Sequence, residues 1–111
     1  MKEHEKNLIE LVKSHNIFLL KNYIKANPNI SLHFTDNKGK TLLHHVFHKN
    51  SENILYLIQY LLEQDISPNC VDEKFETPLD LAKKYDLKTI ISMFNSFLEN
   101  KKQEEIGFIS Y

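Results

Sequence analysis

The chain has 111 residues and a net charge of −1, with 14 basic residues set against 15 acidic ones. Hydrophobic residues make up 41% and charged residues 26%, which is typical of one globular domain and not of a disordered chain. Because the charges balance and no basic patch is evident, we expect no nucleic-acid binding.

No stretch approaches the ~20 consecutive apolar residues of a membrane span, and the N-terminus lacks the apolar core of a signal peptide. We therefore expect no membrane partner and a cytoplasmic location, in the protein's own cell or in a host cell. The single cysteine, Cys70, excludes an internal disulfide and is expected to be a small buried residue. With two glycines and three prolines in all, helices should dominate over a β-sandwich or barrel.

In chain order, the apolar residues predict three pairs of short helices. The first pair covers residues 3–14 and 17–24. The second pair covers residues 42–47 and a run whose spacing of three and four places five side chains on one face: Ile54, Leu57, Ile58, Leu61 and Leu62. The third pair covers residues 79–82 and 87–98. Two long loops rich in turn formers, residues 26–40 and 64–76, separate the pairs.

The two loops align with each other at an offset of 36 positions. "DNKGKTLLHHV", starting at Asp36, matches "DEKFETPLDLA", starting at Asp72. Each threonine, Thr41 and Thr77, is a candidate N-cap whose hydroxyl accepts a hydrogen bond from a first-turn N–H. Pro78 then occupies the first helical position, where its missing N–H is harmless.

At these residues the sequence resembles the ankyrin repeat family, whose unit of about 33 residues carries a Thr-Pro-Leu-His signature. The stretch "GKTLLHHV" has the glycine, threonine, leucine and histidine of that pattern, with Leu42 in place of proline. The stretch "FETPLDLAKKYD" has the threonine, proline, leucine and alanine, with Asp80 in place of histidine and Phe75 in place of the loop glycine.

The resemblance implies an all-α solenoid of three helix-turn-helix repeats with projecting loops or β-hairpin fingers. Its units would be residues 4–34, 35–70 and 71–98, within one domain of residues 1–98 that is followed by a tail of residues 99–111. The family's variable positions lie on the finger tips and on the concave face of the first helices, where they contact partner proteins. Carried over by position, the expected partner-binding residues are Thr35, Asn37, Lys38, Lys40, His48, Lys49, Val71, Glu73, Lys74, Phe75, Glu76, Lys84 and Tyr85.

Phe75 is the most informative of these positions, because the family's glycine there often has positive φ. Two interpretations stay open. Either the turn is remodelled with the ring tucked inward, or the ring is exposed as an anchor for a partner.

The histidines raise the question of a metal site, since His44 and His48 are four residues apart and would share a helical face. No third ligand motif accompanies them. The resemblance gives His44 a structural role instead, as the histidine that hydrogen-bonds across the loop between neighbouring units. We therefore expect no metal and no other cofactor, and we expect His48 to contact a partner.

The sequence also lacks a supported nucleophile arrangement and a glycine-rich phosphate loop, so we expect no enzyme. The expected function is to bind another protein as a monomer, as an inhibitor, an immunity-type antagonist of a toxin, or an adaptor. A structural or self-association module is the alternative, and a metal-dependent activity is a remote third.

The tail turns from charged to apolar, with Ile106, Phe108, Ile109 and Tyr111. It either folds back over the last helix pair or acts as a short recognition peptide.

Overall fold

The computed structural model describes the backbone of residues 1–109 and the side chains of residues 1–103. This part of the chain contains six α-helices, one short 3-10 helix and no β-strand, so the all-α expectation is confirmed for it. In chain order the elements are α1 (Glu3–Lys13), α2 (Ile17–Ala26), α3 (Leu42–His45), η1 (Val46–His48), α4 (Ile54–Glu63), α5 (Pro78–Lys84) and α6 (Lys88–Ile109).

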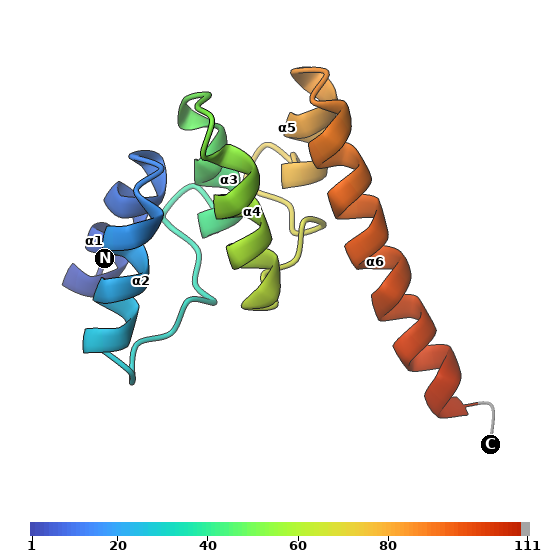
Figure 1. The fold of residues 1–111 in the computed structure, drawn as a ribbon, viewed down its shortest axis with the longest axis horizontal. Helices are drawn as coiled ribbons and strands as arrows, with labels where there is room; N and C mark the ends of the chain where they lie inside the picture. Colours follow the sequence, from blue (N-terminus) through green and yellow to red (C-terminus); the bar gives the residue numbers. More distant parts are fainter. Residues whose placement is uncertain (110–111) are drawn as a thin grey trace.

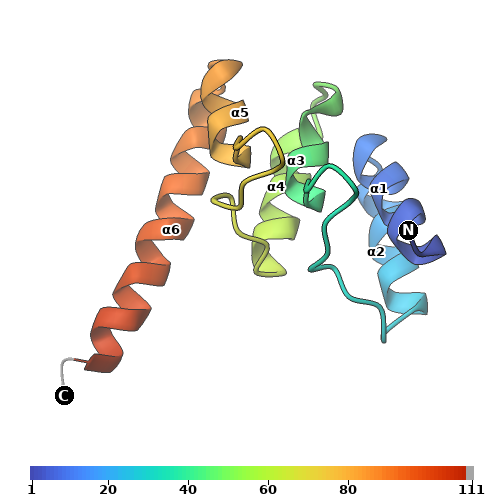
Figure 2. The same cartoon turned by 180° about the vertical axis from the view of Figure 1, so that it is seen from behind.

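The helices form three pairs that stand side by side (Figure 1). The first helices contact one another in a row, α1 with α3 and α3 with α5, while α4 contacts α6 behind them. The view from behind shows the two long loops on the side of the first helices (Figure 2). The molecule therefore has a first-helix face, formed by α1, α3, η1 and α5 with their loops, and a second-helix face, formed by α2, α4 and α6.

One continuous apolar core connects the pairs. It includes Leu8 and Val12 of α1, Leu43 of α3 and Phe94 of α6, all fully buried. The face predicted for α4 is confirmed: of its five predicted residues, Ile54, Leu57, Ile58 and Leu61 are buried and Leu62 is partly buried. The core thus lies between the two rows of helices and leaves the loops at its edge.

The helix starts follow from their first residues. Thr77 Oγ1 accepts from the N–H of Asp80 at 2.9 Å, and the Asp80 carboxylate accepts from the N–H of Thr77 at 3.0 Å, so α5 begins with a reciprocal cap. At Thr41 the partner side chain is the ring of His44, whose Nδ1 accepts from the Thr41 N–H at 3.0 Å and lies 3.0 Å from the Thr41 hydroxyl.

A buried histidine that the sequence did not point to joins the first two pairs. His15 follows α1 with φ of 58° and is 2% exposed. Its Nε2–H donates to the Val46 carbonyl at 2.7 Å, and its Nδ1 accepts from the Ser51 hydroxyl at 2.6 Å. The loop between η1 and α4, which carries Ser51, therefore completes the packing of α1 on its neighbour.

The domain boundary expected after residue 98 falls inside a helix, because α6 runs without a break from Lys88 to Ile109. The backbone of residues 99–109 therefore extends the helix and does not fold back over the last pair (Figure 1). Lys101 Nζ lies 2.6 Å from Asp65 Oδ1 and links α6 to the turn after α4. The apolar side chains expected to act in the tail, Ile106, Phe108, Ile109 and Tyr111, lie outside the described residues.

Candidate functional site

The candidate site begins at a tight turn that precedes α3. Asp36 Oδ1 accepts from the backbone N–H groups of Lys38 and Lys40, each at 2.9 Å. The backbone closes the same turn, because the Asp36 N–H donates to the Lys40 carbonyl and the Gly39 N–H donates to the Asp36 carbonyl. Two backbone bonds make a turn and not a ladder, so the loop contains no paired β-hairpin within the described residues.

The second loop repeats this turn with Asp72. Its Oδ1 accepts from the N–H groups of Lys74 and Glu76 at 2.9 and 3.0 Å. Phe75 occupies the place of Gly39 and has φ of 61°, close to the 76° of the glycine. Its side chain is 81% exposed. The turn is therefore not remodelled around a buried ring: Phe75 keeps the glycine-like backbone and presents its ring to solvent.

Contact between the two turns explains why only one of them needs glycine. The Glu73 N–H donates to the Lys38 carbonyl at 2.9 Å. A Cβ added to Gly39 would lie 3.2 Å from the Glu73 nitrogen and 3.3 Å from the Asp72 Cα, which is tight contact with backbone. The second turn has open space at position 75, as the exposure of the Phe75 side chain shows. A side chain fits at position 75 and not at position 39.

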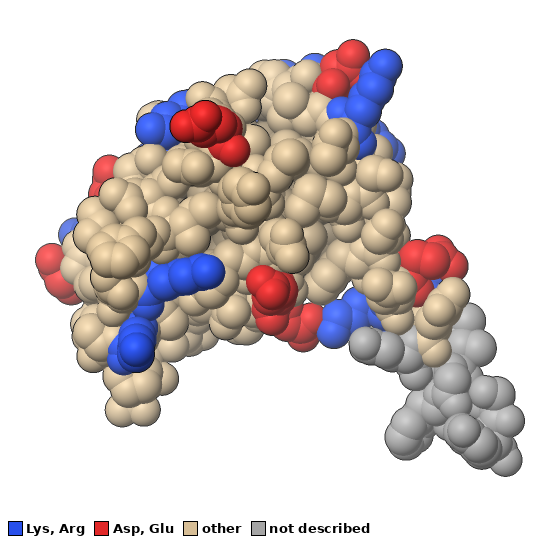
Figure 3. All heavy atoms as spheres, in the orientation of Figure 1, with Lys and Arg blue, Asp and Glu red and all other residues tan. Residues whose placement is uncertain are grey.

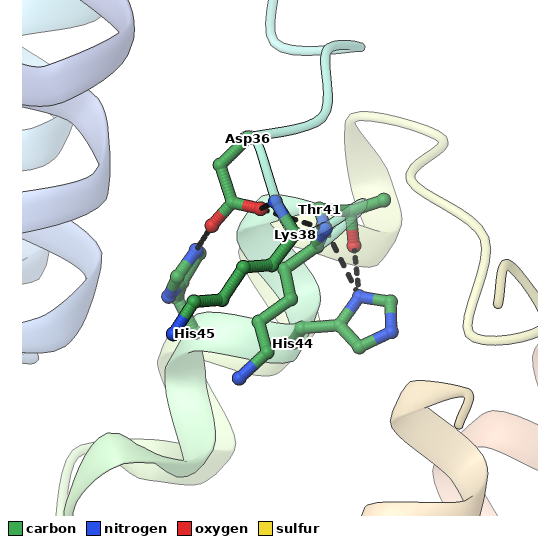
Figure 4. Close-up of polar contacts among 6 residues, drawn as sticks. Asp36, Lys38, Thr41, His44 and His45 are labelled. Carbon is green, nitrogen blue, oxygen red and sulfur yellow. Dashed lines mark hydrogen bonds and ion pairs between the residues drawn. The ribbon is translucent and has the colours of Figure 1, made fainter. Parts of the chain in front are cut away.

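His44 contacts Thr41 in the first loop (Figure 4) and also reaches the second loop. Its Nδ1 must accept, because the Thr41 N–H can only donate. Its Nε2–H then donates to the Glu76 carbonyl at 2.9 Å. The structural role expected of His44 is confirmed, and with both ring nitrogens engaged the residue is not free to bind a metal.

His45 forms a second polar contact in the same turn (Figure 4), in which its Nε2 lies 2.9 Å from Asp36 Oδ2. Burial alone would raise the pKa of Asp36, but the N–H groups of Lys40 and Lys38 and the His45 ring lower it below its ordinary value. Burial lowers the pKa of His45, and Lys13 and Lys40 act in the same direction, while Asp36 opposes them. The pair is thus a neutral imidazole donating to an ionised carboxylate.

Beside this turn, the first-helix face is hollowed. We call this volume of about 370 Å³ the lysine hollow. Five expected partner-binding residues line it: Asn37, Lys38, Lys40, His48 and Tyr85. The wall is completed by the polar cluster of the turn and by three residues that the sequence did not single out, namely Lys13, Phe47 and Leu81. The structure therefore joins residues from the first loop and from the ends of all three first helices.

A second hollow of about 410 Å³ adjoins the first, since Phe47, His48 and Tyr85 line both. Lys49, another of the expected partner-binding residues, lies in its wall. The Phe47 and Tyr85 rings stack with centroids 6.5 Å apart and planes at 27°, and Phe47 meets the buried Phe94 edge-on. The aromatic wall between the hollows is thereby anchored in the core.

The remaining expected residues lie outside these two hollows. Thr35 lines an apolar groove of about 350 Å³ near Leu32, Ile66 and Cys70. Cys70 is exposed, so the expectation of a buried cysteine was wrong, because Ile66 and Pro68 take the core positions of its loop. Lys84 Nζ stands 5.8 Å from the Tyr85 ring centroid. The second turn carries the rest, most of them exposed: Val71, Glu73, Lys74, Phe75 and the partly buried Glu76.

A signal for the missed Lys13 existed in the helix ends. Lys13 is the last residue of α1, as His48 is the last of η1 and Lys84 is the last of α5. Aligning the ends of the first helices would have placed Lys13 with the expected contact residues.

Among the described residues, no group of three or more His, Cys, Asp or Glu side chains could hold a metal ion. Over the same part of the chain, no helix is both long enough and apolar enough to cross a membrane. No model of a known protein family matches the sequence, and neither does any curated protein.

The turn at Phe75 generates a stability prediction. Phe75→Gly should raise the free energy of unfolding by about 0.5 kcal/mol, because it relieves the positive φ of a non-glycine residue without removing core packing. Gly39→Ala should lower it by about 1–2 kcal/mol, since it adds strain and a backbone contact. Urea unfolding measures both. A loss above about 1 kcal/mol in Phe75→Gly would show that the ring packs on the fold.

The His45–Asp36 pair generates a pH dependence. Because folding lowers the pKa of His45, the unfolded chain binds more protons there just below the ordinary value of about 6.5, and stability must fall as the pH drops through that range. His45→Gln keeps a donor for Asp36 but cannot titrate, so its unfolding free energy should fall less between pH 7.5 and 5.5. His48→Gln, an exposed control, should follow the wild type. Equal pH slopes in all three proteins would contradict this assignment.

Proposed function

We propose that the chain is an ankyrin-like solenoid of three units that binds another protein through its turns and its first-helix face. The Thr-Leu-Leu-His and Thr-Pro-Leu-Asp starts of α3 and α5, and the two matching turns 36 residues apart, support this family assignment. The row of first-helix contacts from α1 to α5 supports the solenoid arrangement.

One observation carries the binding function: the two adjoining hollows gather lysines and aromatic rings from separate elements onto one surface. Tyr85 is 52% exposed although it stacks on Phe47. Aromatic side chains held rigidly at a surface are frequent binding hot spots, because little rotamer freedom is lost when a partner covers them.

Phe75 adds independent support. An aromatic ring that is almost fully exposed, on a residue with positive φ, is unfavourable for stability in two ways. Such local strain is found mainly where function requires it. Contact with a partner would explain why position 75 carries an aromatic ring that is exposed on the chain itself.

A protein that binds through such a face acts by covering a surface of its partner, so the proposed roles are inhibitor, immunity-type antagonist or adaptor, in a cytoplasm and as a monomer. The alternative is self-association, and a specific feature favours it. On the second-helix face, Phe18 and Tyr56 are 73% and 68% exposed. Charged side chains are sparse on this face (Figure 3). Light scattering after size exclusion separates the two, since a self-associating chain gains mass with concentration.

The binding proposal predicts the behaviour of two matched triple variants. Lys49→Ala/Phe75→Ala/Tyr85→Ala removes one lysine and two aromatic rings near the hollows and the second turn. Lys21→Ala/Phe18→Ala/Tyr56→Ala removes the same side chains from the second-helix face. Pull-down with mass spectrometry from the source cells should identify a partner that the first variant loses and the second retains, with circular dichroism showing unchanged helicity in both.

The opposite pattern, with capture lost only in the second variant, would place binding on the second-helix face. Loss of helicity in the first variant would show that its three side chains are structural.

A further inference from the structure

We infer that the partner inserts an acidic side chain, flanked by an apolar or aromatic one, into the lysine hollow. This inference rests on the proposed binding function and specifies the chemistry of what is bound. Three features of the hollow support it. Its lysines form no ion pair within the described residues, one wall consists of aromatic rings, and two backbone N–H groups of the turn already donate to Asp36.

The charge of the hollow is opposite to that of the chain. Four lysines line the two adjoining hollows, Lys13, Lys38, Lys40 and Lys49, against a single carboxylate, Asp36. The whole chain has a net charge of −1, so this excess is local. A cluster of one sign in a concave surface attracts groups of the other sign and speeds their association.

The lysines are available to a partner. Within the described residues, Lys13, Lys38 and Lys40 form no ion pair. Asp36 does not neutralise them by direct contact, because its Oδ1 accepts from two backbone N–H groups and its Oδ2 accepts from His45. An entering carboxylate therefore meets three ammonium groups that form no direct ion pair within the described residues, although Lys40 also acts at longer range on the Asp72 carboxylate.

The aromatic wall indicates which kind of residue lies beside that carboxylate in the partner. The Phe47–Tyr85 stack lines the same hollow as the lysines, and His48 lies between the two hollows as a lining residue of both. A partner segment that places a carboxylate at the lysines therefore places its adjacent side chain against rings. An apolar or aromatic residue beside Asp or Glu fits both walls.

Two observations favour a carboxylate over a phosphate. The sequence contains no arginine, so the bidentate fork that suits phosphate groups is absent from the chain. The N–H groups of Lys38 and Lys40, which in an open turn would cradle a phosphate, already bind Asp36. A dianion would also meet stronger repulsion from Asp36 than a monoanion.

The test uses the full chain labelled with ¹⁵N and three probes in nuclear magnetic resonance titrations. The acidic probe is the capped peptide acetyl-Glu-Tyr-Glu-Phe-Glu-amide. The neutral probe replaces each Glu with Gln, and the third probe is inorganic phosphate. Lys13→Gln/Lys38→Gln/Lys40→Gln removes the lysines of the hollow. Lys6→Gln/Lys25→Gln/Lys102→Gln is the matched control, since these three lysines are exposed and line neither hollow.

The acidic peptide should shift amide signals of Lys38, Lys40, His48 and Tyr85, and its affinity should fall as salt is added. Each exposed ion pair contributes roughly two- to threefold in affinity, so the hollow variant should bind about tenfold more weakly than the control variant. Absence of these shifts at millimolar peptide overturns the inference. Equal binding of the neutral peptide, or tighter binding of inorganic phosphate than of the acidic peptide, also overturns it.

Binding of the captured partner to two variants distinguishes this inference from the proposed function. If the hollow variant retains that partner at full affinity while Lys49→Ala/Phe75→Ala/Tyr85→Ala loses it, protein binding stands and the acidic class of ligand is wrong. If the hollow variant and Lys49→Ala/Phe75→Ala/Tyr85→Ala both retain the partner, both proposals fail.

Discussion

Two buried histidines hold the three helical pairs in register. His15 donates through Nε2–H to the Val46 carbonyl, and His44 donates through Nε2–H to the Glu76 carbonyl. These contacts span 31 and 32 residues, so each ring reaches from one pair to the next at nearly the same spacing. Because both rings are almost fully buried, losing either bond would leave a polar group without a partner. The row of first helices, and thus the hollowed face, depends on them.

The two carboxylates at Asp36 and Asp72 set the turns, and they do so with backbone partners. Burial alone would raise the pKa of each carboxyl group, but the hydrogen bonds from backbone N–H groups lower it below its ordinary value. Apart from Gly39, where a side chain does not fit, the side chains between the anchoring atoms are then free to vary without loss of the turn. The turns are thus stabilised by Asp, Thr and His contacts to backbone, while lysines and aromatic rings on the first-helix face are left for binding.

Periodicity and cap chemistry were sufficient to predict the helix pairs, the buried face of α4 and the Thr77 cap, while the bridging role of His44 was predicted only from the resemblance to ankyrin repeats. The sequence could not predict the role of His15, because its partner Ser51 lies 36 residues away, in the loop between η1 and α4. The exposure of Phe75 depends on the open space at the last turn, which no local pattern encodes. The separation of the expected contact residues into two hollows and an outlying turn depends likewise on packing between pairs.

The most direct test of the proposed function is cross-saturation between a captured, unlabelled partner and the labelled chain. This measurement reports which amides lie against the partner's protons, whatever the partner is. Binding through the first-helix face predicts intensity losses at Lys38, Lys40, His48 and Tyr85. Losses confined to α2 and α4, around Phe18 and Tyr56, would contradict it and would assign the interaction to the second-helix face.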